Sequence, residues 1–227
     1  MTFDLDIPRH LPAITLAETV FFPQVVLPLH IFEERYRRML KDALNSDRIF
    51  AVLTLDEEGR SFPQHEEPPH PIATAGIIRA CQKNENGTSN LILQGLCRIR
   101  VAEILHDDPY RIIAIEPILS TPLASENQAR HLRNRLLNRL QVQRRLGGPI
   151  TSEMLKFLQN IDEAEMVVDM IAFSLCPDPE DKLRLLGMIR VEDRLREMIR
   201  ISEREIAALR LQRELQGDMD DDAIGLN

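Results

Sequence analysis

The chain has 227 residues, a formal net charge of −8 and 44% apolar residues. This apolar content is enough for one large domain or two small ones with buried cores, and the negative charge disfavours nucleic-acid binding unless the bases gather in one patch. The longest apolar runs are far shorter than the roughly 18 to 20 residues that span a bilayer, and the amino-terminus has no basic flank followed by a long apolar segment. We therefore expect a cytoplasmic protein that does not contact membranes.

Residues 1–120 contain short β-rich runs separated by proline, glycine and asparagine, which is the spacing of a small barrel or curled sheet. Asn86-Gly87 predicts a tight type I′ hairpin turn that sets Cys81 opposite about Ile92. Gly95 interrupts a long strand and predicts a bulge or a bend. Four prolines between residues 59 and 71 predict an extended loop.

One early helix is expected at about residues 32–45, where it would close an open end of the barrel. The apolar residues at helical spacing that would face the barrel are Phe32, Tyr36, Met39, Leu40 and Ala43.

Residues 121–216 are typical of a helical bundle, because helix formers recur at three-to-four spacing. Breaks and caps predict helices at about 125–146, 151–159, 162–175, 178–189 and 191–215. The acidic residues 217–227 lack periodicity and predict a disordered tail. The last helix carries an apolar stripe that either serves the bundle or binds a second subunit, so homo-oligomerisation stays open.

The motifs in the sequence do not favour an enzyme. The glycines fit neither a Walker A loop nor a dinucleotide fingerprint, and there is no nucleophile elbow or H-E-x-x-H helix. Ser152 and Lys156 lie one turn apart, but a capping serine beside a solvated lysine is the simpler interpretation. The prolines between His65 and His70 hold the chain extended, so the two histidine side chains cannot converge on one metal ion. We expect no catalytic residue, no metal site and no cofactor.

The helix expected over 126–146 contains six arginines but only one acidic residue, Glu126. They spread around the helix, so no single stripe follows a phosphate backbone, and ion pairs with acids such as Glu163 and Glu165 are the favoured interpretation. The six are Arg130, Arg133, Arg135, Arg139, Arg144 and Arg145.

Three segments carry a resemblance to a known family. "LPAITLAETVFFPQVVLPLHIFEERYRRML" resembles the start of the Lon protease amino-terminal domain. "ATAGIIRACQKNENGTSNLILQGLCRIRVAEILHDDPYRIIAIEPI" is similar to that family's hairpin and its following strand, and "MVVDMIAFSLCPDPEDKLRLLGMIRVEDRLREMIRISEREI" to its bundle. The resemblance covers about residues 10–210 and looks closest to stand-alone bacterial members. Gln24 stands where a glycine is common, and Glu34 replaces a frequent proline.

The resemblance implies an α+β fold: a PUA-like β-barrel of about six strands and one helix, followed by a carboxy-terminal helical bundle. Because no AAA+ motor or Ser-Lys peptidase is expected here, it also implies a non-enzymatic, ATP-independent module. Such a module would bind unfolded or apolar polypeptide segments, or act as an adaptor or regulator with a protease or chaperone as partner. A nucleic-acid-binding protein that uses the barrel and the arginine-rich helix is the alternative, because PUA-like barrels also occur in RNA-binding proteins.

The expected polypeptide-binding residues lie in the first of these segments. A binding surface needs apolar anchors that are only half buried, and the competing interpretation is that these residues all belong to the core. The expected residues are Phe21, Phe22, Pro23, Leu29, Phe32 and Tyr36.

Overall fold

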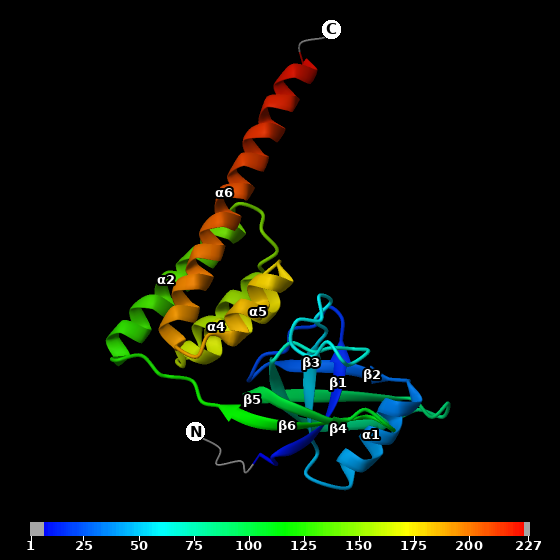
Figure 1. Ribbon diagram of the computed structural model, residues 1–227. Helices are drawn as coiled ribbons and strands as arrows, with labels where there is room; N and C mark the ends of the chain where they lie inside the picture. Colours follow the sequence, from blue (N-terminus) through cyan, green and yellow to red (C-terminus); the bar gives the residue numbers. More distant parts are fainter. Residues whose placement is uncertain (1–6, 225–227) are drawn as a thin grey trace. The chain divides into compact units, whose positions relative to one another are not determined.

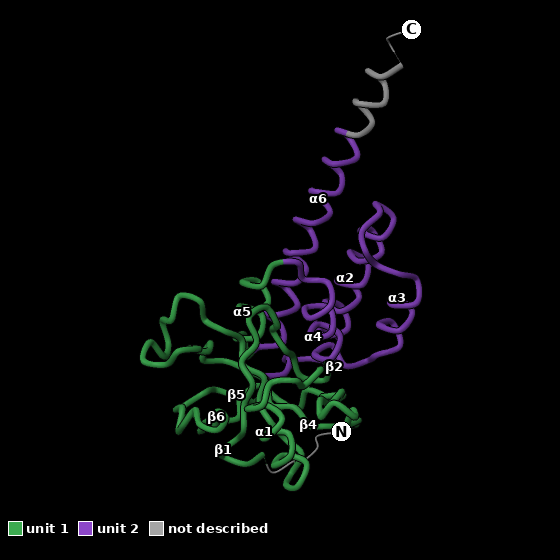
Figure 2. The backbone as a smooth tube through the Cα atoms, turned by 90° about the vertical axis from the view of Figure 1, so that its right-hand side faces the viewer, with its two compact units in different colours: residues 1–120, 178–189 green, residues 121–177, 190–227 purple. Residues whose placement is uncertain are grey.

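The computed structural model of the chain describes residues 7–224, with the backbone alone over 216–224. The chain forms two compact units (Figure 2). Unit 1 contains residues up to 120 together with 178–189, and unit 2 contains residues 121–177 and those from 190 onward. The first boundary between the units follows residue 120, and one later helix returns to unit 1.

Unit 1 is built on a six-stranded sheet with the order β2-β5-β4-β3-β1-β6 (Figure 1). An additional pairing of β5 with β6 closes five strands into a barrel and leaves β2 as an edge strand, paired with residues 89–94 of β5. Among the strands of the described part, only β1 and β3 pair in parallel. The strands are β1 (His10–Leu16), β2 (Val26–Ile31), β3 (Ile49–Thr54), β4 (Ile72–Lys83), β5 (Ser89–His106) and β6 (Arg111–Ile118).

The core of the barrel is an aliphatic cluster to which all five closed strands contribute. Every residue of β3 is buried, as expected for a strand that is covered on both faces. The cluster consists of Leu11, Ala13, Ile49, Ala51, Leu53, Ala73, Ala75, Ile99, Val101, Ile104, Ile113 and Ile115. The predicted α+β barrel is thus confirmed.

The helix α1 (Glu34–Leu44) buries four of the five residues that were expected to face the barrel. The exception is Phe32, which precedes the helix and is 62% exposed. It stands outside the helical register, because α1 begins two residues later.

The helix α5 (Pro179–Gly187) belongs to unit 1, whereas its sequence suggested a part of the bundle. Its anchor is the buried Arg98 of β5, whose Nε donates a hydrogen bond to the Leu186 carbonyl at 3.0 Å. A buried guanidinium needs such acceptors, so α5 contributes to the satisfaction of a charge that the barrel sequence buries.

The β4–β5 hairpin turns where predicted but with another geometry. Gly87 has a positive φ of 82° and Asn86 does not, which excludes a type I′ turn. Hydrogen bonds from Asn84 N to Thr88 O and from Gly87 N to Asn84 O instead close a three-residue loop. The longer loop places Cys81 opposite Leu91 rather than Ile92.

The predicted irregularity at Gly95 is confirmed, and its cause is a close approach of two backbones. The pairing of β4 with β5 shifts register next to the facing pair Gly76 and Gly95. Gly95 N donates to Val25 O and Gln24 N donates to Gly95 O, both at 2.9 Å. A Cβ atom on Gly95 would lie 2.2 Å from the Phe22 carbonyl oxygen, so no larger residue fits this crossing.

Unit 2 contains four helices: α2 (Glu126–Arg145), α3 (Ser152–Gln159), α4 (Ala164–Leu175) and α6 (Val191–Ile224). Two of them, α2 and α3, start at predicted capping residues, whereas α4 starts after Glu163 without a side-chain cap. Ser125 Oγ accepts a hydrogen bond from Gln128 N, and Thr151 Oγ1 accepts one from Met154 N. No helix in the described part is both long and apolar enough to cross a bilayer.

The predicted disordered tail covers residues 217–227. The backbone of α6 continues as a helix to Ile224, because a helix that is already nucleated gains one hydrogen bond for each added residue. Residues 225–227 lie outside the described part.

We expect Gly95→Ala to lower the free energy of unfolding by at least about 2 kcal/mol, because the methyl group overpacks the crossing with Phe22. Gly187→Ala is the matched control, since a Cβ there meets nothing within 4 Å, and its effect should stay within about 1 kcal/mol. Urea denaturation measures both. Equal, small effects would show that the crossing is not tightly packed.

Candidate functional site

The edge strand β2 presents an apolar face to solvent. Its residues alternate strictly, with Val26, Pro28 and His30 exposed and Leu27 and Ile31 buried. This is the period of two expected for a strand with one covered face. A proline is tolerated in such a strand because the outer edge has no partner that needs its missing N–H group.

The exposed face continues across two further strands through the register. Pro28 of β2 pairs with Ile92 of β5, and Ile92 pairs with Ala80 of β4. The next row places His30 beside Asn90, and Asn90 beside Gln82. Since neighbours in a sheet point to the same side, these two rows form one continuous surface.

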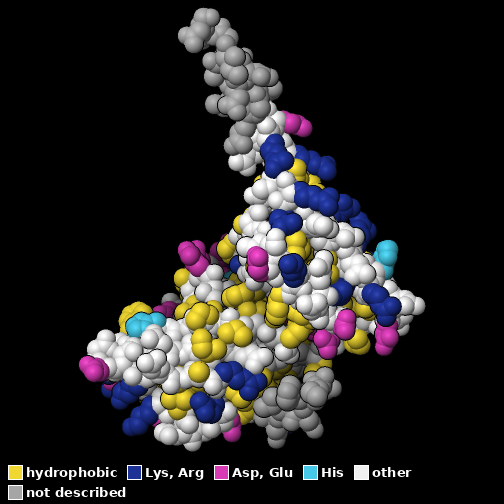
Figure 3. Space-filling model, turned by 180° about the vertical axis from the view of Figure 1, so that it is seen from behind, with side chains coloured by type: hydrophobic (Ala, Val, Ile, Leu, Met, Phe, Trp, Pro, Cys, Tyr) yellow, Lys and Arg dark blue, Asp and Glu magenta, His cyan; other side chains and the backbone are white. Residues whose placement is uncertain are grey.

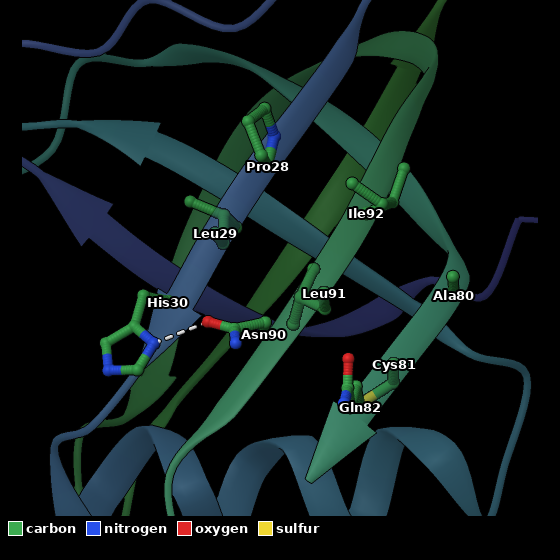
Figure 4. Close-up of a pocket in the computed structure, with 9 residues that line it drawn as sticks. All are labelled: Pro28, Leu29, His30, Ala80, Cys81, Gln82, Asn90, Leu91 and Ile92. Atoms are coloured by element: carbon green, nitrogen blue, oxygen red, sulfur yellow. Dashed lines mark hydrogen bonds between the residues drawn. The ribbon is translucent and has the colours of Figure 1, made fainter. Parts of the chain in front are cut away.

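The surface is hollowed into an open groove of about 540 Å³ (Figure 4). The His30 ring is fixed by a 2.6 Å contact between Nδ1 and Asn90 Oδ1 and stacks on Phe32 at a centroid distance of 6.1 Å. The residues that line the groove are Pro28, Leu29, His30, Ala80, Cys81, Gln82, Asn90, Leu91 and Ile92. Phe32 thereby extends the apolar surface beyond the end of β2.

Burial is unusually low for the large apolar side chains in and beside this groove. Val26 is 51% exposed, Phe32 62% and Ile92 37%. Isolated exposed apolar residues are common, but a connected set with a polar end marks a binding surface. We call this set, Val26, Pro28, Phe32, Ala80 and Ile92, the β2–β5 patch.

The structure separates the six expected binding residues into two groups. Phe21, Phe22, Pro23 and Tyr36 are buried and serve the core of unit 1, which corrects the expectation that they contact a ligand directly. For residues 21–23 the reason is the Gly95 crossing, which presses the segment before β2 onto the barrel. Tyr36 lies on the buried face of α1, where its hydroxyl accepts a hydrogen bond from Thr15 N of β1 at 3.3 Å. The half-buried Leu29 lines the groove and the exposed Phe32 stacks on His30 beside it, and the binding role of both stays a prediction.

The sequence did not identify three residues of the patch as binding residues: Val26, Pro28 and Ile92. The available signal was the alternation within VLPLHI together with the pairing of that strand to the hairpin. The alternation alone does not identify β2 as an edge strand whose outer face stays uncovered.

A second cavity of about 300 Å³ in unit 1 is polar and lies at the loop between β3 and β4. Arg35 holds Glu67 through two hydrogen bonds of 2.9 and 3.0 Å. The largely buried Arg111 donates to Asp107 at 2.6 Å and to the Glu67 carbonyl at 2.7 Å. These charges neutralise one another, so the cavity is better described as a clasp that fixes the proline-rich loop than as a ligand site.

Asp107 is the shared acceptor in this clasp, since His65 Nδ1 also lies 2.7 Å from its Oδ2. Burial acts to raise the pKa of Asp107, but hydrogen bonds from Arg111 and His65 outweigh it and hold the pKa below its ordinary value. The carboxylate is therefore stabilised in its charged form.

The residues considered for catalysis do not assemble. Ser152 Oγ accepts a hydrogen bond from the Arg144 guanidinium, which cannot act as a general base. Burial raises the pKa of the Cys97 thiol and so disfavours the nucleophilic thiolate. No three acidic, histidine or cysteine side chains of the described residues group closely enough to hold a metal ion.

Three arginines of α2 are occupied by structural contacts. Arg133 is buried and donates to the carbonyls of Gln159, the last residue of α3, and of Ile161, two residues beyond it. Arg135 and Arg139 both lie 3.3 Å from Glu203 of α6. Acids do pair with these arginines as expected, but the partner is Glu203, while Glu165 binds the buried Arg194.

Comparisons with known proteins agree on one family. Residues 10–204 match the family described as the ATP-dependent protease La (LON) substrate-binding domain. The chain is 30% identical over 220 residues to a Lon protease of Dictyoglomus thermophilum and 28% identical over 207 residues to one of Brevibacillus choshinensis. These alignments cover 94% and 91% of the chain but only 27% and 26% of the relatives.

Two solved structures share the fold. The amino-terminal domain of the Mycobacterium avium complex Lon protease superposes with a TM-score of 0.66 at 15% identity, covering 86% of this chain and 98% of that one. A Lon N-terminal domain protein from Xanthomonas campestris gives a TM-score of 0.59 at 21% identity, with 84% and 96% covered.

The clasp predicts a specific pH dependence. Because the pKa of Asp107 is lowered in the folded state, the stability it contributes is present above its ordinary pKa and is lost as the pH falls through that range. Asp107→Asn should lower the urea midpoint at pH 7 and flatten its decline between about pH 5 and 3. Parallel declines in both proteins would contradict this role for Asp107.

Proposed function

Because the chain belongs to the family of the Lon substrate-binding domain, we propose that it is a non-enzymatic module that binds apolar polypeptide segments through the β2–β5 patch. The observation that carries the proposal is the exposure of Val26, Phe32 and Ile92 beside an open groove. Exposing large apolar side chains to water is unfavourable. A bound apolar segment covers them and gains roughly 25 cal/mol of free energy for each Å² of apolar surface buried.

The character of the groove suits unfolded chains rather than one fixed sequence. Pro28, Ile92 and Ala80 form its centre. Apolar contacts with these residues are not directional, so they do not require one particular side chain in the bound segment. His30, Asn90 and Gln82 in the next row supply polar atoms that can bond the backbone of any extended segment. Because these groups stand on paired strands, little conformational entropy is lost on binding.

The role we propose in the cell is that of an adaptor or holder that presents such segments to a protease or a chaperone. Several relatives are Lon proteases, and the chain spans about a quarter of the length of the curated relatives it matches. The three cysteines form no disulfide, which fits the cytoplasmic location that we propose.

The direct test is fluorescence anisotropy of a labelled, permanently unfolded polypeptide, titrated at about 0.05 and 0.5 M salt. Apolar binding should be saturable and tolerate salt, because screening weakens charge contacts and not apolar burial. No binding up to about millimolar concentration, where the binding free energy is only about −4 kcal/mol, would contradict the proposal. Binding of single-stranded RNA that falls steeply with salt, without polypeptide binding, would favour the nucleic-acid alternative.

Two variants locate the surface. Ile92→Glu and Phe32→Ser should each weaken polypeptide binding about tenfold, the effect of losing one apolar anchor worth roughly 1.4 kcal/mol. Leu119→Glu is the control, because Leu119 is 83% exposed and lies outside the patch. Circular dichroism should show an unchanged fold in all three. Unaltered affinity in both patch variants would exclude this surface.

A further inference from the structure

The outer edge of β2 presents backbone N–H and C=O groups in an order that the pairing with β5 determines. Gly95 N donates a hydrogen bond to the Val25 carbonyl at 2.9 Å, so the carbonyl of Val25 points toward β5. Successive residues of a strand point these groups alternately to its two sides. Every second residue after Val25 therefore faces β5, whereas the backbone groups of Val26, Pro28 and His30 face the outer edge.

The proline in β2 agrees with this assignment. Pro28 has no N–H group, so at a position that faces β5 it would remove a hydrogen bond from the sheet. Val26, Pro28 and His30 are all exposed, and among the described residues no strand other than β5 pairs with β2. The free edge therefore offers the carbonyls of these residues as acceptors, and the N–H groups of Val26 and His30 as donors.

A second copy of β2 fits this edge poorly. In a symmetric antiparallel pair, the proline of each copy faces a carbonyl of the other copy and cannot donate a hydrogen bond to it. Every such register that pairs Pro28 therefore leaves two carbonyls without a donor, which is unfavourable where the carbonyls are covered. A strand of another polypeptide meets Pro28 only once, and any extended backbone can supply the donors and acceptors that the rest of the edge needs.

We propose that a client polypeptide binds as an added strand, hydrogen-bonded to the outer edge of β2 beside the β2–β5 patch. Its residue opposite Pro28 donates its N–H group to the Pro28 carbonyl. The side chain of that residue extends the row formed by Pro28, Ile92 and Ala80, on a unit whose surface carries further exposed apolar side chains (Figure 3). The preferred segments are extended and have apolar residues at alternate positions. This inference rests on the proposed function and specifies the conformation of the bound segment.

The first test uses a labelled peptide of alternating valine and threonine, in which the valines lie in the apolar row and their N–H groups point to β2. N-methylation of the valines should weaken binding at least tenfold, because it removes several hydrogen bonds worth about fivefold each. N-methylation of the threonines, whose N–H groups point away, should have little effect. Fluorescence anisotropy measures both.

Two outcomes of this test would overturn strand addition and leave apolar binding at the patch intact. One is equal affinity of the two methylated forms. The other is no binding of the unmethylated peptide while the unfolded polypeptide binds. If neither the peptide nor the unfolded polypeptide binds, the proposed function fails as well.

A pair of variants tests the edge itself. Val26→Pro removes an N–H group that points away from β5, and Val26→Ala keeps it, so both should retain the fold. Val26→Pro should bind the unmethylated peptide about fivefold more weakly than Val26→Ala, the effect of losing one hydrogen bond. Equal affinities, or a Val26→Pro chain that does not fold, would contradict the assignment of this N–H group. A dimer in sedimentation equilibrium that Val26→Pro dissociates would assign the edge to a second copy and overturn the proposal.

Discussion

The contact on which unit 1 depends is the crossing of the Phe22–Val25 backbone over Gly95. Gln24 N donates a hydrogen bond to the Gly95 carbonyl, and Gly95 N donates one to the Val25 carbonyl. These bonds hold the two backbone segments so close together that no side chain fits at Gly95. Two barrel threonines complete the attachment, with Thr54 Oγ1 donating to Thr19 O at 2.8 Å and Thr74 Oγ1 to Phe21 O at 2.6 Å. The crossing buries the aromatic residues and delivers the chain into β2.

The candidate site follows from that geometry. Because β5 bulges at the crossing, its first six residues pair with β2 and its later residues pair with β6. The strand β2 therefore lies outside the closed barrel, where one of its faces meets solvent. In a strand of the closed barrel, alternating apolar residues would belong to the core. On an edge strand the same residues form an exposed patch. One glycine thus couples the closure of the barrel to the exposure of Pro28 and Ile92.

The sequence predicted what local chemistry controls and missed what distant contacts decide. Helix starts at Ser125, Thr151 and Asp178 were predictable because each side chain caps a nearby N–H group. The place of α5 was not, since it depends on Arg98, 88 residues away in the chain. Phe22 and Phe32 are equally apolar in sequence, and only the crossing at Gly95 makes one core and the other surface. Gln24 has a φ of 64°, which explains why glycine suits that position.

We propose that polypeptides bind the outer face of β2, β5 and β4. The most direct measurement is a ¹H–¹⁵N correlation spectrum of the full chain, titrated with an unlabelled unfolded polypeptide. Shift changes should concentrate on the amides of residues 26–32, 80–82 and 90–94, and the amides of unit 2 should be unaffected. Changes confined to α2 and α6, or no changes at saturating polypeptide, would contradict it.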